Sequence, residues 1–255
     1  MGTVEGIILD LDGVVYRGSE LIPGAKEFLD FLERSGRRVV ALTNHAGETA
    51  SFYAEKLGRF GIEFPEERIV TSAWATARYL QETAPDASVY VLGSRALKES
   101  LAAAGLVALE TPERVDYVVA GFDAELSFAK LSRATTYLLN GAALIGTNPD
   151  ALLPTPVGPV PECGPLLAFL EAAAGREPTV IGKPNPHFFE RALERLGTAR
   201  ENTLVVGDTL ETDIAGGRAA GLRTALVLTG NTSGAPLRAA TVVVDDLQEL
   251  TGVLS

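Results

Sequence analysis

The stretch Gly6-Ile7-Ile8-Leu9-Asp10-Leu11-Asp12-Gly13 decides the fold. Its apolar run is typical of a buried parallel strand, and the two carboxylates and the glycine that follow indicate the edge of a sheet. Because strand side chains alternate, Asp10 and Asp12 start on one face, and Gly13 lets the chain turn away. Two carboxylates held together repel each other, so a cation is expected between them, although an ordinary turn at a strand end uses the same residue types.

Polar side chains follow later apolar segments in the same way. Residues 39–42 run directly into a threonine and an asparagine, residues 203–206 run into a glycine and an aspartate, and an isolated lysine lies between a glycine and a proline. Ligands of open α/β sheets bind at the carboxyl ends of the strands, so these side chains are expected to gather at one edge of the sheet. They are Thr43, Asn44, Lys183, Asp208 and Asp213.

The order of the predicted elements favours a parallel sheet flanked by helices. A helical spacing of apolar residues between the first two predicted strands completes a βαβ unit. After a polar, proline-containing break at residues 82–86 the alternation restarts, with strands predicted at 88–92, 117–120 and 143–145. The first pattern resumes at residue 179. The sequence therefore predicts an α/β protein in which one α/β domain is inserted into another.

Composition and charge narrow the class of protein. Of the 255 residues, 46% are hydrophobic and 22% are charged, as in soluble globular proteins. No apolar run approaches the ~18 to 20 residues of a membrane span, and no secretory signal is expected, so the predicted location is cytoplasmic. The net charge of −11 argues against nucleic acid as a partner, which would require a basic stripe, but not against a small anionic substrate.

Several other kinds of site are disfavoured. Neither histidine, His45 or His187, has the spaced neighbours of a transition-metal site. The single cysteine, Cys163, excludes an intrachain disulfide, and nothing adjacent would lower its pKa. Neither the phosphate-binding loop of NTPases nor the Gly-x-Gly-x-x-Gly of dinucleotide-binding folds occurs.

Four motifs, in their order along the chain, resemble those of the haloacid dehalogenase-like (HAD) phosphohydrolases. They are Asp-Gly-Val-Val-Tyr-Arg-Gly from residue 12, Leu-Thr-Asn from residue 42, Gly-Lys-Pro-Asn-Pro from residue 182 and Gly-Asp-x-x-x-Thr-Asp from residue 207. Within that superfamily they look like the NagD-like branch of 4-nitrophenylphosphatases, phosphoglycolate phosphatases and nucleotide phosphatases. The resemblance covers essentially the whole chain. It implies a Rossmann-like parallel-sheet core, residues 1–81 and 179–255, with an inserted α/β cap domain, residues 82–178.

The resemblance also implies an activity, that of a Mg²⁺-dependent phosphatase that hydrolyses small soluble phosphomonoesters through an aspartyl-phosphate. Asp10 would attack phosphorus, and Asp12 would act as the general acid and base. The carboxylates of Asp10 and Asp208 and the backbone carbonyl of Asp12 would bind Mg²⁺, with Asp213 behind them.

Substrate contacts follow from the same resemblance. Thr43, Asn44 and Gly13 would bind the transferring phosphoryl group. Lys183 would hold both Asp10 and a phosphoryl oxygen. These residues handle the phosphoryl group that every candidate substrate shares, so they leave the physiological phosphomonoester open.

Two further segments are expected to face the leaving group. Relatives often have Thr-Asn-Asn-Ser where this chain has Thr-Asn-His-Ala, so His45 is a candidate substrate contact and the contacts of that serine are not carried over. Residues 147–161 form a proline-rich connection that resembles the cap loop facing the core site, with Asn148 and Asp150 as its candidate contacts. A solvated turn is the alternative, because Asn-Pro and Pro-Asp favour turns whatever their function.

Other activities are weighed against hydrolysis. A phosphomutase or phosphotransferase would pass the phosphoryl group to a sugar, but those relatives generally carry a helical cap, unlike the strands predicted here. A phosphate-binding protein without catalysis would not need every catalytic motif. A dehalogenase would have no use for the acid at Asp12 or for the metal site. A homodimer through the cap is consistent with the resemblance.

Overall fold

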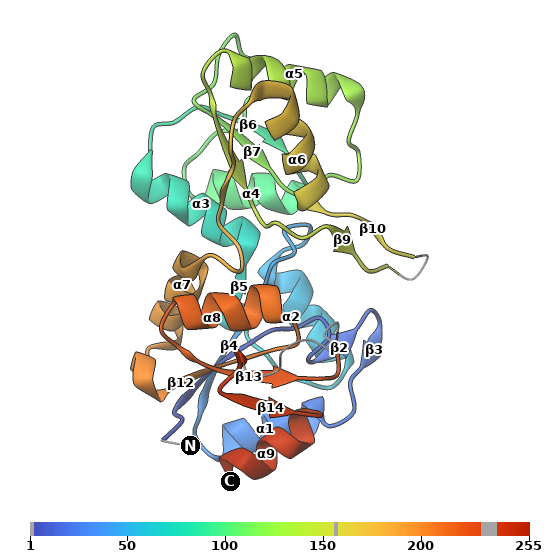
Figure 1. The fold of residues 1–255 in the computed structure, drawn as a ribbon, viewed down its shortest axis with the longest axis vertical. Helices are drawn as coiled ribbons and strands as arrows, with labels where there is room; N and C mark the ends of the chain where they lie inside the picture. The colour runs from blue at the N-terminus through green and yellow to red at the C-terminus, as the bar shows by residue number, and fades with distance from the viewer. Residues whose placement is uncertain (1–2, 156–157, 231–238) are drawn as a thin grey trace. The chain divides into compact units, whose positions relative to one another are not determined.

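The computed structural model describes residues 3–155, 158–230 and 239–255. The chain folds as two compact units (Figure 1), the first formed by Met1–Thr43, Ala50–Val70 and Lys183–Ser255, and the second by Asn44–Thr49 and Thr71–Gly182. Each unit has its own parallel sheet with helices on both faces. None of the helices in the described ranges has both the length and the apolar character that a membrane crossing requires.

The first unit is built on a six-stranded parallel sheet. In spatial order its strands are β14 (Val242–Val244), β13 (Arg223–Val227), β12 (Thr203–Gly207), β1 (Gly6–Leu9), β4 (Arg38–Thr43) and β5 (Ile69–Thr71). Ile8 of β1 pairs with Val205 on one side and with Val40 on the other. A central strand of this kind is buried on both faces, which explains why its sequence is continuously apolar.

Helices cover both faces of this sheet. They are α1 (Ala25–Arg34), α2 (Ala50–Arg59), α7 (Pro186–Leu196), α8 (Ala215–Ala219) and α9 (Leu247–Leu254), with a π-helical turn at Leu210–Ile214. In Figure 1, α1 and α9 pack together on one face and α7 and α8 on the other. Phe28 and Leu32 of α1 are fully buried, because residues four positions apart share the inner side of a helix. A small hairpin of β2 (Tyr16–Arg17) and β3 (Glu20–Leu21) follows β1.

The second unit has a smaller parallel sheet. In spatial order its strands are β11 (Thr179–Val180), β8 (Ala143–Gly146), β7 (Tyr117–Ala120) and β6 (Val89–Leu92). Its helices are α3 (Ser72–Thr83), α4 (Arg95–Ala103), α5 (Phe128–Leu139) and α6 (Cys163–Ala174). Figure 1 shows α3 and α4 together on one face and α5 and α6 on the other. A short hairpin of β9 (Leu152–Leu153) and β10 (Val160–Pro161) precedes α6.

The fold class predicted from the sequence is confirmed, but the compact units have different boundaries from the predicted domains. The first pattern is predicted to resume at residue 179, yet β11 pairs with β8, with Thr179 opposite Ile145. Helix α3, placed by the sequence in the first domain, packs against α4 in the second unit. The unit to which β11 belongs is decided by its pairing with β8, and the unit to which α3 belongs by its packing against α4. The polar break in the sequence indicates neither of these contacts. The roles of the two units as catalytic core and cap stay predictions.

Candidate active site

Three buried aspartates gather at the carboxyl edge of the first unit's sheet. Asp10 follows β1 directly, Asp208 follows β12, and Asp213 lies in the π-helical turn after it. Leu9 pairs with Val206, and the Asp10 N–H donates to the Val206 carbonyl at 2.9 Å, so the two strands end side by side. One carboxylate oxygen from each aspartate lies within 4.8 Å of the others. Strand register therefore brings together carboxylates that are some 200 residues apart in the chain.

Lys183 bridges two members of this aspartate cluster. Its Nζ donates to Asp10 Oδ1 at 2.6 Å and to Asp213 Oδ1 at 2.7 Å, and the lysine is only 4% exposed. Burial by itself lowers the pKa of Lys183, but the charges of Asp10 and Asp213 raise this pKa above its ordinary value overall, so the ammonium stays charged. Burial raises the pKa of Asp10, and Lys183 opposes that shift.

The donor set of the aspartate cluster fits a hard divalent cation. Three buried carboxylates face one ammonium, and buried charge is unfavourable unless it is compensated. All the donors are carboxylate oxygens, the ligands that Mg²⁺ and Ca²⁺ prefer. The backbone closes tightly on Asp208, because a Cβ at Gly13 or at Gly230 would collide with its carboxylate. The Asp208 oxygens are thus held in place from two sides.

Asp213 and Asp12 are placed in different ways. Asp213 uses one oxygen for Lys183 and accepts the Thr209 N–H at 3.2 Å with the other, so it supports the cluster from behind. Asp12 is exposed and lies outside the cluster. Its backbone bridges to that of Tyr16, and burial first and the Asp12 charge second raise the pKa of the Tyr16 phenol. Asp12 therefore lies next to the buried Tyr16 and is accessible to water.

Two more of the predicted residues lie at this edge. Thr43 is the last residue of β4, the neighbour of β1, and is buried. Gly13 has φ +80°, a left-handed conformation that favours glycine, and its carbonyl accepts the Thr229 hydroxyl at 2.7 Å. The turn after β1 thus depends on glycine both for its conformation and for its close approach to Asp208.

In the second unit, the predicted residues Asn148 and Asp150 both bind Asn44. Asn148 Nδ2 donates to the Asn44 carbonyl at 2.9 Å, and Asn44 Nδ2 donates to the two Asp150 carboxylate oxygens at 3.1 and 3.2 Å. Thr147 and Asn148 are completely buried, whereas Pro149 is exposed and Asp150 is half-buried, so the segment is solvated only in part. Direct contact of Asn148 or Asp150 with substrate stays a prediction, because these hydrogen bonds go to protein groups.

His45 is oriented by three neighbours, none of which the sequence analysis singled out. Its Nδ1 lies 3.4 Å from Glu162 Oε1, its ring centroid lies 5.4 Å from that of Phe122, and a Cβ at Gly47 would collide with its Nε2. Glu162 is buried, although it lies between a proline and a cysteine at the start of a helix, where an acidic residue ordinarily indicates a solvated cap. It makes no cap hydrogen bond to α6, so only the structure reveals its partners.

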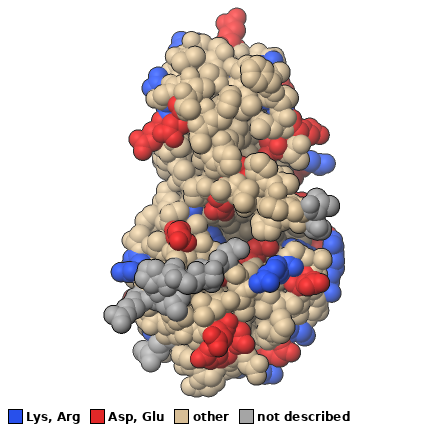
Figure 2. Space-filling view, turned by 45° about the vertical axis from the view of Figure 1, so that its right-hand side comes forward, with Lys and Arg blue, Asp and Glu red and all other residues tan. Residues whose placement is uncertain are grey.

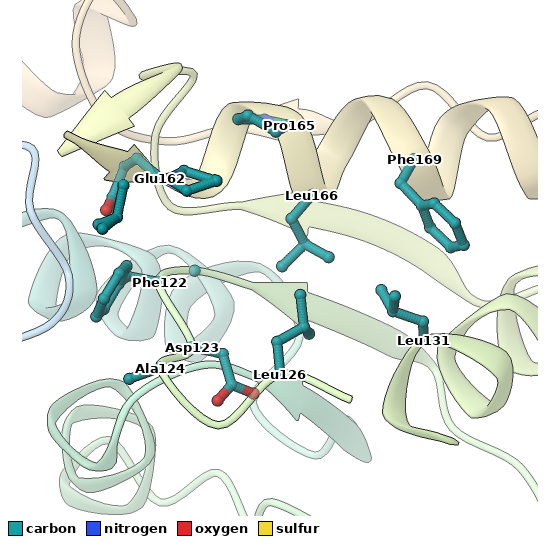
Figure 3. A pocket seen from close by; sticks show the side chains of 12 residues that line it. Phe122, Asp123, Ala124, Leu126, Leu131, Glu162, Pro165, Leu166 and Phe169 are labelled. Atoms are coloured by element: carbon teal, nitrogen blue, oxygen red, sulfur yellow. The ribbon is translucent and has the colours of Figure 1, made fainter. Parts of the chain in front are cut away.

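The second unit also contains a mostly apolar cavity of about 520 Å³. Figure 3 shows Leu126 and Leu166 pointing toward each other across it, with Glu162 and Phe122 at one end. A second cavity of about 470 Å³ is lined by His45 and Phe122 together with the polar and charged side chains of Ser94 and Lys130. Phe122 therefore lies between an apolar and a polar hollow of the same unit.

Charged side chains are interspersed on the surface. On the face that Figure 2 shows, the basic residues drawn as described do not form a continuous stripe, and acidic groups lie among them. This face therefore lacks the basic stripe that nucleic-acid binding requires, and the net charge of the chain is −11.

Known proteins match the chain over most of its length. A family model of haloacid dehalogenase-like hydrolases matches residues 7–107, and a second HAD-like hydrolase model matches residues 180–250. The acid sugar phosphatase of Staphylococcus aureus is 40% identical over 230 residues, which are 90% of this chain and 88% of that protein. These matches span both ends of the chain and include all four motifs.

Solved phosphatase structures share the fold. A 4-nitrophenylphosphatase from Thermotoga maritima has a TM-score of 0.91 at 36% identity, covering 99% of this chain and 98% of that chain. A glycerol phosphate phosphatase from Mycobacterium tuberculosis has a TM-score of 0.89 at 34% identity, covering 98% of this chain and 76% of that chain.

The parallel-sheet fold, the aspartate cluster with its lysine, and these relatives define a phosphoric monoester hydrolase. The chain belongs to the haloacid dehalogenase-like hydrolases. Its structural relatives include the 4-nitrophenylphosphatases, which confirms the resemblance predicted from the sequence. Hydrolases of this family generally use a divalent metal ion, in agreement with the carboxylates found here.

Proposed function

We propose that the protein is a Mg²⁺-dependent phosphatase that hydrolyses small phosphomonoesters through an aspartyl-phosphate on Asp10. The observation that carries this proposal is the ion pair of Asp10 with Lys183 inside a buried aspartate cluster at the end of β1. The names of the relatives refer to sugar phosphates, glycerol phosphate and nitrophenyl phosphate. Sugar phosphates, glycerol phosphate and nitrophenyl phosphate are therefore the first substrates to test.

Asp10 is the nucleophile of this proposal. Lys183 holds Oδ1 of Asp10, so attack on phosphorus falls to Oδ2. The new bond joins Oδ2 to phosphorus while the bond from phosphorus to the ester oxygen breaks, and the electron pair leaves with that oxygen. Mg²⁺ bound by Asp10, Asp208 and the backbone carbonyl of Asp12 would reduce the repulsion between the anionic nucleophile and the anionic ester.

Asp12 supplies and removes the protons. In the first step it donates a proton to the leaving oxygen, and in the second it takes a proton from the water that attacks the aspartyl-phosphate. Its exposure supports this role, because an acid and base that serves substrate and water must be reached by both. Release of inorganic phosphate then restores the Asp10 carboxylate.

The remaining residues bind charge on the phosphoryl group. Thr43 supplies a hydroxyl, Asn44 an amide and Lys183 an ammonium, all of which stabilise negative charge that develops in the transition state. The Gly13 N–H donates to the Tyr16 carbonyl at 2.8 Å, so Gly13 serves the phosphoryl site by shaping the turn after β1. Asp213 holds Lys183 in place. This assignment rests on the match of these positions to the family motifs, and mutagenesis can test each position.

The proposal is tested with 4-nitrophenyl phosphate and the Asp10→Asn variant. Activity should require a divalent ion, disappear with a chelator, return with Mg²⁺ and be abolished in Asp10→Asn. Asp30→Asn on α1 is the matched control, because Asp30 is partly exposed and pairs only with Lys26 at 3.5 Å among the described ion pairs. Full activity of Asp10→Asn, or of the chelated protein, would exclude the mechanism.

A further inference from the structure

Glu162 is a buried carboxylate in the second unit that the reaction steps do not use. It is 5% exposed, and its Oε1 accepts Asn148 Nδ2 at 3.1 Å. Its Oε2 is buried without a hydrogen-bond partner among the described residues. A buried carboxylate is unfavourable unless its hydrogen bonds compensate for the lost water. Because Glu162 makes no cap hydrogen bond to α6, its burial calls for a role other than capping.

Asn148 connects Glu162 to Asn44. The Asn148 amide donates both to Glu162 and to the Asn44 carbonyl, the second at 2.9 Å. Its Oδ1 accepts the Asp150 N–H at 3.0 Å, and the Asp150 carboxylate in turn accepts the Asn44 side-chain amide. Asn44 is therefore held at its backbone and at its side chain by residues of one short loop.

The chemistry of Glu162 decides which way the Asn148 amide faces. An ionised carboxylate only accepts hydrogen bonds, whereas an amide has a donor end and an acceptor end. Next to the Glu162 carboxylate, Asn148 must present its NH₂ group, one hydrogen of which goes to Glu162 and the other to the Asn44 carbonyl. Its Oδ1 then faces the Asp150 N–H and accepts from it. A glutamine at residue 162 would remove this constraint, because it presents a donor as readily as an acceptor.

We propose that Glu162 is a positioning residue of the phosphatase: by fixing the orientation of Asn148, it holds Asn44 in the conformation that binds the phosphoryl group. This inference rests on the proposed function of Asn44, which directly follows Thr43 in the chain. Residues 148, 150 and 162 thus act through Asn44 and need not touch the substrate.

The test compares Glu162→Gln, Asn148→Ala and the double variant. Glu162→Gln should lower kcat for 4-nitrophenyl phosphate about 10- to 100-fold, the usual effect of losing a group that orients another, with an unchanged unfolding temperature. Glu162 Oε1 also lies 3.4 Å from His45 Nδ1, so the double variant separates the two routes. It should be no slower than Asn148→Ala, because the effect of Glu162 on Asn44 passes through the Asn148 amide. Glu171→Gln is the matched control, since Glu171 is exposed on the same helix. A kcat within twofold of wild type in Glu162→Gln, or additive losses in the double variant, would overturn the proposal.

A reversed pair separates positioning from packing. Glu162→Gln combined with Asn148→Asp restores a hydrogen bond between the two positions with its direction reversed, but residue 148 then has no donor for the Asn44 carbonyl. This variant should stay as inactive as Asn148→Asp alone. Recovery of wild-type kcat would show that any hydrogen bond at this place suffices, and would overturn the proposal. If Glu162→Gln does not fold, the comparison of Asn148→Asp with Asn148→Ala replaces it, and wild-type kcat in either variant contradicts the inference.

A readout without catalysis distinguishes this inference from the proposed function. The side-chain amide signals of Asn44 and Asn148 are followed by NMR in wild type, Glu162→Gln and Glu171→Gln. Hydrogen exchange of the Asn44 side-chain amide should accelerate only in Glu162→Gln. Unchanged exchange in this variant would contradict the proposal that Glu162 positions Asn44. An inactive wild-type protein with this exchange pattern would refute the phosphatase proposal and leave the positioning of Asn44 standing.

Discussion

Asp12 differs from Asp10, Asp208 and Asp213 in its exposure, and this difference leads to a prediction about leaving groups. Asp12→Asn should reduce hydrolysis of alkyl phosphates such as glycerol phosphate by about 10²- to 10⁴-fold, because an alkoxide requires a proton in the transition state. The loss with an aryl phosphate should be smaller, since nitrophenolate leaves without protonation. The measurement is kcat/KM for both substrates, and equal losses would remove Asp12 from the acid role.

Cys163 gives a second prediction at the residue scale. It is completely buried, and burial raises its pKa to about 11. The thiolate is the reactive form, so at pH 8 a thiol reagent should not modify the native protein and should react once denaturant unfolds it. Because the pKa of Cys163 is raised by folding, any stability that it contributes is present at lower pH and is lost as the pH rises toward 11. Rapid modification of native protein at pH 8 would contradict the burial of this residue.

At the scale of single elements, the inner face of α1 holds the first unit together. Phe28→Ala should lower the free energy of unfolding by about 3–5 kcal/mol, because it removes a fully buried aromatic side chain and leaves a cavity. Phe128→Ala, the same change at a side chain that is 79% exposed, should alter it by less than about 0.5 kcal/mol. Denaturant titrations followed by circular dichroism measure both values. Similar losses in the two variants would show that α1 does not bury this face.

The elements show how far the sequence could predict the structure. The strand ends at Asp10, Thr43 and Asp208 were predictable, because a buried parallel strand is continuously apolar and stops at its functional residues. Residue 179 is predicted from the sequence to lie in the first domain, whereas β11 pairs with Ile145 in the sheet of the second unit; two residues carry no periodicity from which this pairing could be predicted. Glu162 could not be predicted, because its partners come from residues 45 and 148, which are close only in space.

At the scale of the whole molecule, the aspartate cluster should make stability depend on a divalent ion. Mg²⁺ should raise the unfolding temperature of wild type, by the equivalent of about 2.7 kcal/mol at about 100 Kd, because it binds the folded cluster and not the unfolded chain. Chelator should reverse the shift, and Asp208→Asn should show almost none. The readout is differential scanning calorimetry with and without Mg²⁺, and a shift in Asp208→Asn equal to that of wild type would exclude this cluster as the site.

The sequence of the whole chain leaves some properties open. The second unit contains a parallel sheet and the cavities described above, and its role in selecting the substrate stays a prediction. A cytoplasmic location and a homodimer through this unit stay predictions. A screen of phosphorylated metabolites and a measurement of molecular mass in solution test the substrate class and the dimer, respectively.

The most direct test of the account is to trap the phosphorylated enzyme. Asp12→Asn is mixed with 4-nitrophenyl phosphate and Mg²⁺, quenched in acid, digested and mapped by mass spectrometry. The aryl group leaves without an acid, but the second step then lacks its base, so the intermediate should accumulate. The account predicts one phosphoryl group on the peptide that contains Asp10, and none when Asp10→Asn is added to the same variant. Release of nitrophenol without protein-bound phosphate, or phosphate on any other residue, would contradict it.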